Sequence, residues 1–339
     1  MLVNFSSFLS INMLSNQIPV KISVVVPLYN EEENIDALFG RLLAVLETIN
    51  TSYEVVCVND GSRDNTLKNL VEYHQRYPQI KVVNLSRNFG KDIAMSAGID
   101  YSQGMAVIPI DADLQDPPEL IAEMIEKWQQ GYDVVYASRR VRIGESWLKR
   151  FTAEGFYQVI NKLSRVPIPP NTGDFRLIDR RVVESIKKMP ERQRFMKGIF
   201  AWVGYKQTSI LFDREPRYQG QTKWNYWKLW NFAIDGITSF SFLPLKVWTY
   251  VGFIISLVSL VYASFLMLRT IILGIDVPGY ASLMAAILFL GGIQLLTLGI
   301  IGEYIGRVYE EVKGRPLYLV RDCYGFENRE QVTDKITQN

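Results

Sequence analysis

Short apolar segments alternate with amphipathic segments along residues 21–140. Runs rich in Val and Ile are typical of buried strands, and apolar residues at every third or fourth position are typical of helices packed on a sheet. The pattern predicts strands at 21–27, 53–58, 81–85, 105–110 and 133–138. It predicts a helix beginning near Asn30 and helices at 66–76, 92–101 and 118–130. We therefore expect an α/β fold, a Rossmann-like and mainly parallel sheet with helices on both faces.

Two long uncharged runs follow near the C-terminal end. Residues 247–268 and 277–302 contain no Asp, Glu, Lys or Arg. About 20 apolar residues span a hydrocarbon core of roughly 30 Å, and both runs are longer than ordinary core helices. The sequence predicts two transmembrane helices, at about 247–272 and 277–304, rather than two buried core helices. Most of the flanking Lys and Arg residues lie outside this pair, so both termini are expected in the cytoplasm.

Composition restricts the chemistry further. The chain has 37 Lys and Arg against 35 Asp and Glu, so bulk charge does not favour a nucleic-acid partner. Two distant cysteines and one histidine argue against a disulfide scaffold and a Cys/His zinc site. A G-x-G-x-x-G turn does not follow the first strand, and a P-loop motif is missing from the sequence, so dinucleotide and P-loop sites lose their main support.

Carboxylates follow the fourth predicted strand directly. In a parallel sheet ligands bind at the carboxyl ends of the strands, where Asp111, Asp113 and Gln115 stand. Alternate residues of an extended segment point the same way, so we expect these three side chains to lie together. Carboxylate and amide oxygens suit Mg²⁺ or Mn²⁺. A solvated turn without a ligand is the alternative interpretation.

A cationic cluster follows the fifth predicted strand, and it consists of Arg139, Arg140, Arg142, Lys149 and Arg150. Guanidinium groups suit phosphate oxygens, so the cluster fits a phosphate-bearing ligand. It equally fits attraction to anionic lipid headgroups. Residues 146–163 and 223–245 are amphipathic and rich in aromatic residues, which is typical of interfacial helices. Packing against the core is the alternative for both segments.

Several motifs occur in a fixed order along residues 21–320, and together they resemble a known family. They are VVVPLYNEE at 24–32, NDGS at 59–62, DADLQDPP at 111–118, GDFRL at 173–177 and RYQGQTK at 217–223. This set resembles glycosyltransferase family 2 with a GT-A fold. Within that family it is most similar to the polyisoprenyl-phosphate glycosyltransferases, closest to the bactoprenol glucosyltransferases and kin of the dolichol-phosphate mannosyltransferases.

The resemblance implies inverting transfer of a hexose, glucose from UDP-glucose, to undecaprenyl phosphate. It implies that uridine and ribose contact Pro27, Tyr29, Glu31 and Asp60. Lys91 belongs to the same nucleotide-sugar set. Asp111, Asp113 and Gln115 would hold Mg²⁺ or Mn²⁺ and the donor diphosphate, with Asp113 counted among the catalytic residues. Arg139 and Arg150 would contact the acceptor phosphate.

The acceptor chemistry is consistent with a site that lacks histidine. A phosphate monoester has a second pKa of about 6, so its oxygen is largely ionised near neutral pH and needs little help from a base. We assign Asp174 to the acceptor side, where it accepts a residual proton or orients the phosphate; an ion pair with Arg176 is the structural alternative. Arg217 and Lys223 are assigned to the donor diphosphate, with a plain linker as the alternative.

The predicted organisation has five parts: residues 1–20 poorly ordered, 21–222 a cytoplasmic catalytic domain, 223–245 a juxtamembrane helix, 246–309 the transmembrane pair and 310–339 a cytoplasmic tail. The chain is expected in a bacterial inner membrane. Its glycine-rich second span and its kin favour a homo-oligomer, a tetramer in particular. Alternatives are another donor (GDP-mannose, a UDP-N-acetylhexosamine or aminoarabinose), a non-catalytic scaffold that binds a nucleotide sugar, a nucleotidyltransferase and a processive synthase.

Overall fold

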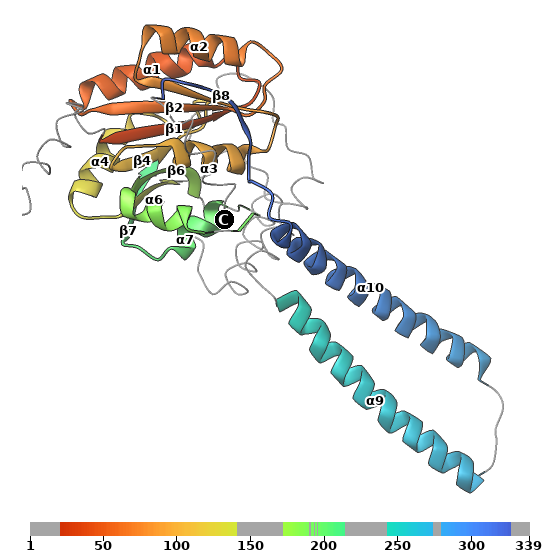
Figure 1. Ribbon diagram of the computed structural model, residues 1–339. Coiled ribbons are helices and arrows are strands. Elements are labelled where there is room, and N and C mark those ends of the chain that lie inside the picture. The colour runs from red at the N-terminus through yellow and green to blue at the C-terminus, as the bar shows by residue number, and fades with distance from the viewer. Residues whose placement is uncertain are drawn as a thin grey trace, which may run out of the picture.

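The computed structural model describes residues 21–140, 172–189, 191–192, 194, 196–213, 243–273 and 279–326. They form an α/β part and two long helices that project from it (Figure 1). The predictions for residues 1–20, for the segment 146–163, for residues 223–242, and for Arg150, Arg217 and Lys223 lie outside the described residues.

Eight strands of the described chain form one sheet. They are β1 (Ile22–Leu28), β2 (Tyr53–Asn59), β3 (Ile80–Leu85), β4 (Ala106–Pro109), β5 (Val134–Arg139), β6 (Thr172–Asp179), β7 (Gln207–Phe212) and β8 (Val320–Tyr324). The order is β7-β5-β6-β4-β1-β2-β3-β8. Only β6 and β8 run against the others, which confirms a mainly parallel sheet. Because β6 is antiparallel, its first residues lie at the edge where the parallel strands end.

Helices cover both faces of the sheet, as predicted. One face packs against α1 (Ile35–Thr48), α2 (Thr66–Arg76) and α4 (Leu120–Gln129). The other face packs against α3 (Lys91–Tyr101), α6 (Arg180–Lys187) and α7 (Met196–Trp202). Figure 1 shows α1 and α2 on one side of β1 and β2, with α3 on the other. The reason is the period of two along a strand, which sends Val24 and Val26 into the first core and Val25 into the second.

The first helix begins later than predicted. The sequence places its start near Asn30, but α1 begins at Ile35 and Asn34 precedes it without a side-chain cap. Asn30 has a left-handed backbone with φ of 52°. Its side chain and the glutamates after it bond to the loop that follows β2, so they are not available to start a helix.

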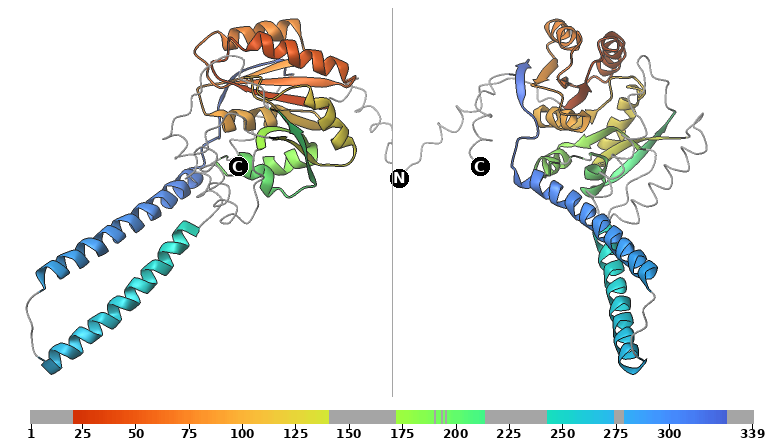
Figure 2. Two further views of the ribbon diagram at one scale, coloured as in Figure 1. Left: turned by 180° about the vertical axis from the view of Figure 1, so that it is seen from behind. Right: turned by 90° about the vertical axis from the view of Figure 1, so that its right-hand side faces the viewer.

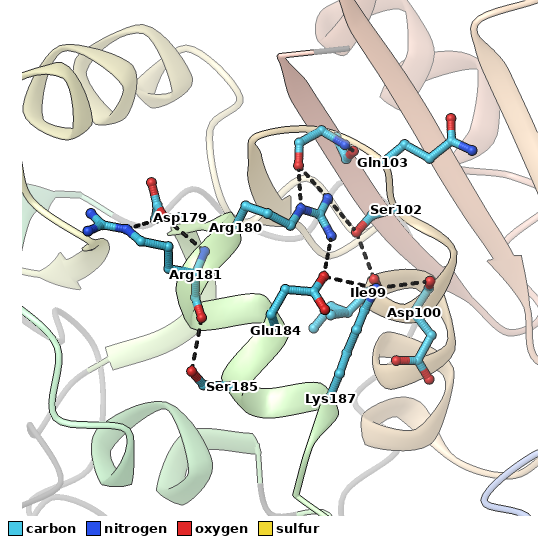
Figure 3. A network of polar contacts seen from close by, with 12 residues as sticks. Ile99, Asp100, Ser102, Gln103, Asp179, Arg180, Arg181, Glu184, Ser185 and Lys187 are labelled. Atoms are coloured by element: carbon cyan, nitrogen blue, oxygen red, sulfur yellow. Dashed lines mark hydrogen bonds and ion pairs between the residues drawn. The ribbon is translucent and has the colours of Figure 1, made fainter. Parts of the chain in front are cut away.

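The end of the sheet opposite the predicted site is fixed by a polar network. Arg180, at the start of α6, donates through Nε to the Gly104 carbonyl at 2.7 Å. Lys187, at the end of the same helix, donates to the Asp100 carbonyl at 3.2 Å. Figure 3 shows α6 beside the end of α3 and the turn that follows it, with Lys187 reaching toward Asp100. Because Gly104 precedes β4 and Asp111 follows it, this network positions β4 without reaching the candidate site.

The two projecting helices are α9 (Leu243–Leu273) and α10 (Tyr280–Val312). Both are longer than the predicted spans, and they leave large apolar side chains exposed along their length. Among the described residues, Phe289–Val312 is long and apolar enough to cross a membrane by length and composition. Figures 1 and 2 show that α9 starts and α10 ends beside the α/β part, so the end of α9 and the start of α10 lie far from the sheet.

After α10 the chain returns to the sheet. Within the segment predicted as a cytoplasmic tail, β8 spans Val320–Tyr324 and pairs antiparallel with β3. The Asp322 carboxylate accepts a hydrogen bond from Asn84 at 2.9 Å, and the Tyr318 hydroxyl donates to Asp100 at 2.9 Å. Residues 313–319 therefore connect the long helix α10 to an edge strand of the sheet.

Candidate active site

The loops after β1 and β2 are tied to each other by side chains. The Ser62 hydroxyl accepts from the Asn30 amide at 3.0 Å, and the Asn30 side chain accepts from the Arg63 amide at 2.8 Å. The Thr66 hydroxyl accepts from the Glu31 amide at 2.9 Å. These bonds form one wall at the carboxyl edge of the sheet, which is where ligands of parallel sheets bind.

The predicted uridine contacts lie along this wall. Pro27 lies near the end of β1 and Tyr29 lies in the loop that follows, and both residues are half-buried. Glu31 uses one carboxylate oxygen to accept from the Asn34 amide group at 2.6 Å. The three residues share one edge of the sheet, and their contact with a nucleotide stays a prediction.

Asp60 lies beneath the loop that follows β3. Its side chain is buried, and its two oxygens accept from the amides of Phe89 at 2.7 Å and Gly90 at 3.0 Å. Burial raises the pKa of Asp60, and the two amide hydrogen bonds offset part of this effect. The residue therefore orders the turn that leads into α3, and uridine contact through this carboxylate stays a prediction.

The D-x-D segment is a turn and not an extended strand. Leu114 has a left-handed φ of 57°, and the Asp113 carboxylate accepts from the Gln115 amide at 3.2 Å. Ala112 and Leu114, which are 5% and 3% exposed, are buried within this turn. Asp111, Asp113 and Gln115 nevertheless alternate with these buried residues and remain partly accessible. The predicted extended backbone was therefore wrong, but the side chains of the three predicted residues are accessible.

Lys91 links two of the predicted site residues. Its ammonium lies 2.7 Å from Asp111 Oδ1, 2.8 Å from Asp111 Oδ2 and 2.7 Å from Asp174 Oδ2. Lys91 begins α3, Asp111 follows β4 and Asp174 lies near the start of β6. Burial lowers the pKa of Lys91, but the two carboxylates outweigh it and hold the pKa well above its usual range. A single cation thus bridges Asp111, predicted for the donor side, and Asp174, predicted for the acceptor side.

Asp174 is ionised although it is largely buried. Burial acts to raise its pKa, and the positive charges of Lys91 and Lys197 outweigh burial and hold the pKa well below its usual range. Its Oδ1 atom is buried and accepts no hydrogen bond from the described residues. The geometry does not favour the alternative of an Asp174–Arg176 ion pair, because Arg176 donates to the Gly173 carbonyl at 2.7 Å instead.

Arg176 is a buried residue two positions after Asp174 on β6. Its side chain is 4% exposed and its guanidinium lies 4.0 Å from the centroid of the Phe200 ring. Burial lowers its pKa to about 10, an effect that Asp174 partly offsets. Arg139, at the end of β5, is close by: a Cβ built on Gly173 would lie 3.9 Å from its Nη2 atom. The structure therefore brings one of the predicted acceptor-phosphate cations to the Asp174 side of the site.

Sequence reasoning missed Asp92 and Lys197. Asp92 follows Lys91 on α3, and burial together with the charge of Asp174 raises its pKa to about 7. Lys197 lies on α7 and lowers the pKa of Asp174. Neither residue belongs to a recognisable motif, and only the packing of α3 and α7 on the same face of the sheet brings them together.

Comparison with known proteins matches both parts of the chain. The family described as Glycosyl transferase family 2 matches residues 23–187, and the GtrB C-terminal hairpin family matches residues 243–308. An uncharacterized glycosyltransferase of Synechocystis sp. is 70% identical over 91% of this chain and 97% of its own length. A prophage bactoprenol glucosyl transferase homolog of Escherichia coli is 49% identical over 89% of this chain and 99% of its own.

A bactoprenol glucosyl transferase of Shigella phage SfII is 48% identical over 90% of this chain and 99% of its own length. These relatives extend over the α/β part, the two long helices and the connections between them. The eight-stranded mixed sheet with its helices is the GT-A-like arrangement that the sequence predicts. The chain is therefore a glycosyltransferase that belongs to glycosyl transferase family 2 and bears a GtrB-type C-terminal hairpin.

Proposed function

We propose that the protein transfers glucose from UDP-glucose to undecaprenyl phosphate, with inversion at the anomeric carbon. The observation that carries this proposal is similarity over nearly the whole chain, 48% over 305 residues, to proteins named bactoprenol glucosyl transferase. The site supports it, since Lys91 joins a carboxylate of the D-x-D turn to a carboxylate assigned to the acceptor.

The D-x-D turn has the chemistry of a magnesium or manganese site. Asp111 and Asp113 supply carboxylate oxygens and Gln115 an amide oxygen, which are ligands for hard cations. A cation already lies against Asp111, namely the ammonium of Lys91. The described residues contain no group of three or more Asp, Glu, His or Cys side chains that could hold a metal ion on its own. We infer that Asp111, Asp113 and Gln115 would hold such an ion together with substrate phosphate, and that the ion would supply positive charge to the diphosphate leaving group.

The residues suit an ionised nucleophile. The acceptor phosphate needs positioning more than deprotonation, because its second pKa is about 6. The low pKa of Asp174 favours a role in orientation over a role as proton acceptor. Arg139 provides a guanidinium near Gly173, the residue before Asp174, and such groups bind phosphate oxygens in a fixed geometry.

The two long helices would place this chemistry at a lipid surface. Their exposed apolar side chains fit a hydrocarbon environment, and both helices meet the α/β part at the same end. We propose that they form a membrane hairpin, with the α/β part and both termini in the cytoplasm. A Cβ built on Gly302 or Gly306 would have no described atom within 4 Å, so this glycine face is open to a second copy, and the tetramer stays a prediction.

The test is a donor panel with the full-length protein in vesicles that contain undecaprenyl phosphate. UDP-glucose should give organic-extractable labelled lipid, and EDTA should abolish the product. Asp113→Ala should lower the rate by about a hundredfold or more, since it removes a group that stabilises developing charge. Lys68→Met, a change at an exposed position of α2, is the control and should keep wild-type activity.

If lipid-linked product forms only with GDP-mannose or with a UDP-N-acetylhexosamine, the proposed donor is wrong, whereas sugar transfer to undecaprenyl phosphate is retained. Donor binding with no lipid-linked product from any nucleotide sugar would contradict the proposal and favour the scaffold. Full activity in EDTA would overturn the metal role.

A further inference from the structure

The position of Lys91 has a consequence for cation binding. Both carboxylate oxygens of Asp111 lie within 2.8 Å of the Lys91 ammonium, at 2.7 and 2.8 Å. Asp111 is also one of the two carboxylates assigned to the divalent cation. The ammonium and a divalent cation therefore compete for the same oxygens, because two positive charges at one carboxylate repel each other.

Lys91 has a second partner that a cation at the D-x-D turn would leave in place. Asp174 Oδ2 lies 2.7 Å from the ammonium, and the Asp174 side chain is only 12% exposed. A flexible four-carbon stem allows an ammonium to leave one carboxylate and stay with another. The Lys91 side chain is 46% exposed, so it has room for this movement.

We propose that Lys91 is a positioning residue that occupies the cation side of Asp111 until the donor and its metal arrive, and then remains on Asp174 to face the acceptor phosphate. This inference rests on the proposed function. It assigns Lys91 to the junction of donor and acceptor, whereas the sequence motifs assign it to the nucleotide sugar alone.

If a divalent cation displaces the Lys91 ammonium from Asp111, an exchange of cations at this carboxylate, then substitution of Lys91 should change metal affinity even without substrate. In Lys91→Met the positive charge that competes for the Asp111 carboxylate is gone. Mn²⁺ should therefore bind about tenfold more tightly than to wild type. In Lys91→Arg the positive charge is kept, so Mn²⁺ affinity should stay within about twofold of wild type.

The kinetic signature differs from that of a diphosphate ligand. In Lys91→Met the KM for undecaprenyl phosphate should rise, because the cation facing the acceptor is lost, and Lys91→Arg should restore most of it. The KM for the donor should change less, because the metal still holds the diphosphate. A merely structural lysine would shift neither constant selectively.

The experiment measures free Mn²⁺ by electron paramagnetic resonance during titration of full-length protein without nucleotide or lipid. The set contains wild type, Lys91→Met, Lys91→Arg and the surface control Lys68→Met, which should match wild type. Adding Asp113→Ala to Lys91→Met should remove the tight binding and so locate it at the D-x-D turn. Thermal unfolding checks that each variant is folded, and Lys91→Gln replaces Lys91→Met if that variant is not.

Tighter Mn²⁺ binding in Lys91→Met with near-normal binding in Lys91→Arg supports the exchange. Unchanged or weaker binding in Lys91→Met, or an equal change in both variants, overturns it. The outcome is separable from the proposed function: tighter binding in a protein that glycosylates no lipid would keep the exchange and reject the acceptor. If the wild-type enzyme glycosylates the lipid but Lys91→Met leaves Mn²⁺ affinity unchanged, the proposed function is retained and the exchange at Asp111 is rejected.

Discussion

The pKa values of two carboxylates in the same cluster, Asp174 and Asp92, are shifted in opposite directions. Lys91 and Lys197 outweigh burial at Asp174 and hold its pKa low, so it stays ionised at any physiological pH. At Asp92 burial is the larger effect, and the negative charge of Asp174 adds to it, raising the pKa to about 7. Asp92 is therefore the acidic group of this cluster whose charge changes near neutral pH.

This difference predicts a pH-dependent stability. An unfolded Asp has a pKa of about 3.9, so between about pH 4 and pH 7 the folded protein keeps a proton on Asp92 that the unfolded chain releases. Stability contributed by this residue should fall as pH rises through that window and level off above it. Asp92→Asn cannot ionise, so it should be more stable than wild type at about pH 8, with the difference vanishing near pH 4.

Thermal unfolding of both proteins across this range measures the effect. A stability difference that is the same at every pH would show that Asp92 does not titrate in the folded protein. In that case packing or hydrogen bonding, and not charge, would distinguish the two side chains.

At the scale of elements, α3 connects the core to the site. It begins with Lys91 at the carboxyl edge of the sheet, and it lies so close to β1 that a Cβ on Gly98 would come 2.2 Å from Val25 Cγ1. Only glycine permits this approach without displacement of the strand or the helix. The contact sets how near α3 lies to β1 and so how Lys91 is presented to Asp111.

Gly98→Ala should therefore destabilise the protein by about 1–3 kcal/mol through overpacking. Gly40→Ala is the matched control, because a Cβ at Gly40 on α1 meets nothing within 4 Å. That change should be neutral or stabilise by up to about 1 kcal/mol, as expected for an exposed helical glycine. Chemical denaturation or thermal melting compares the two, and equal effects from both would contradict the close-contact argument.

Elements with strong local patterns were predicted well, and those defined by pairing were not. Strands β1 to β5 follow apolar runs whose burial is set by composition, and their observed bounds differ little from the predicted ones. Strand β6 contains Asp174 and Arg176 and shows no clean alternation. Strands β7 and β8 are short and partly exposed edge strands, so neither has a strong apolar pattern.

The same distinction applies to the candidate site. Asp111, Asp113 and Asp174 were predicted from motifs, and the structure places Asp111 and Asp174 against one ammonium. The contact of Lys91 with Asp174 joins residues 83 positions apart and depends on β6 lying between β4 and β5, which no local pattern encodes. The D-x-D turn likewise depends on burial of Ala112 and Leu114 in the tertiary fold.

At the scale of the whole molecule, the long helices and the sheet are one connected unit. Helix α10 leads directly into β8, which pairs with β3, and the Asn59 amide group donates to Asn84 at 2.8 Å, while Asn84 donates to Asp322. This chain of polar contacts runs from the strand after the hairpin to the end of β2, next to Asp60. In the membrane arrangement proposed above, this connection would fix the orientation of the site relative to the lipid.

The account as a whole depends on an ionised phosphate as the nucleophile. The most direct measurement compares undecaprenyl phosphate with undecaprenol as acceptor, in the same vesicles, with UDP-glucose and Mg²⁺. We predict labelled glucosyl lipid from the phosphate and none from the alcohol, since the site offers the cations Lys91 and Arg139 for a phosphate, which is already largely ionised near neutral pH. Comparable transfer to both acceptors would contradict the account.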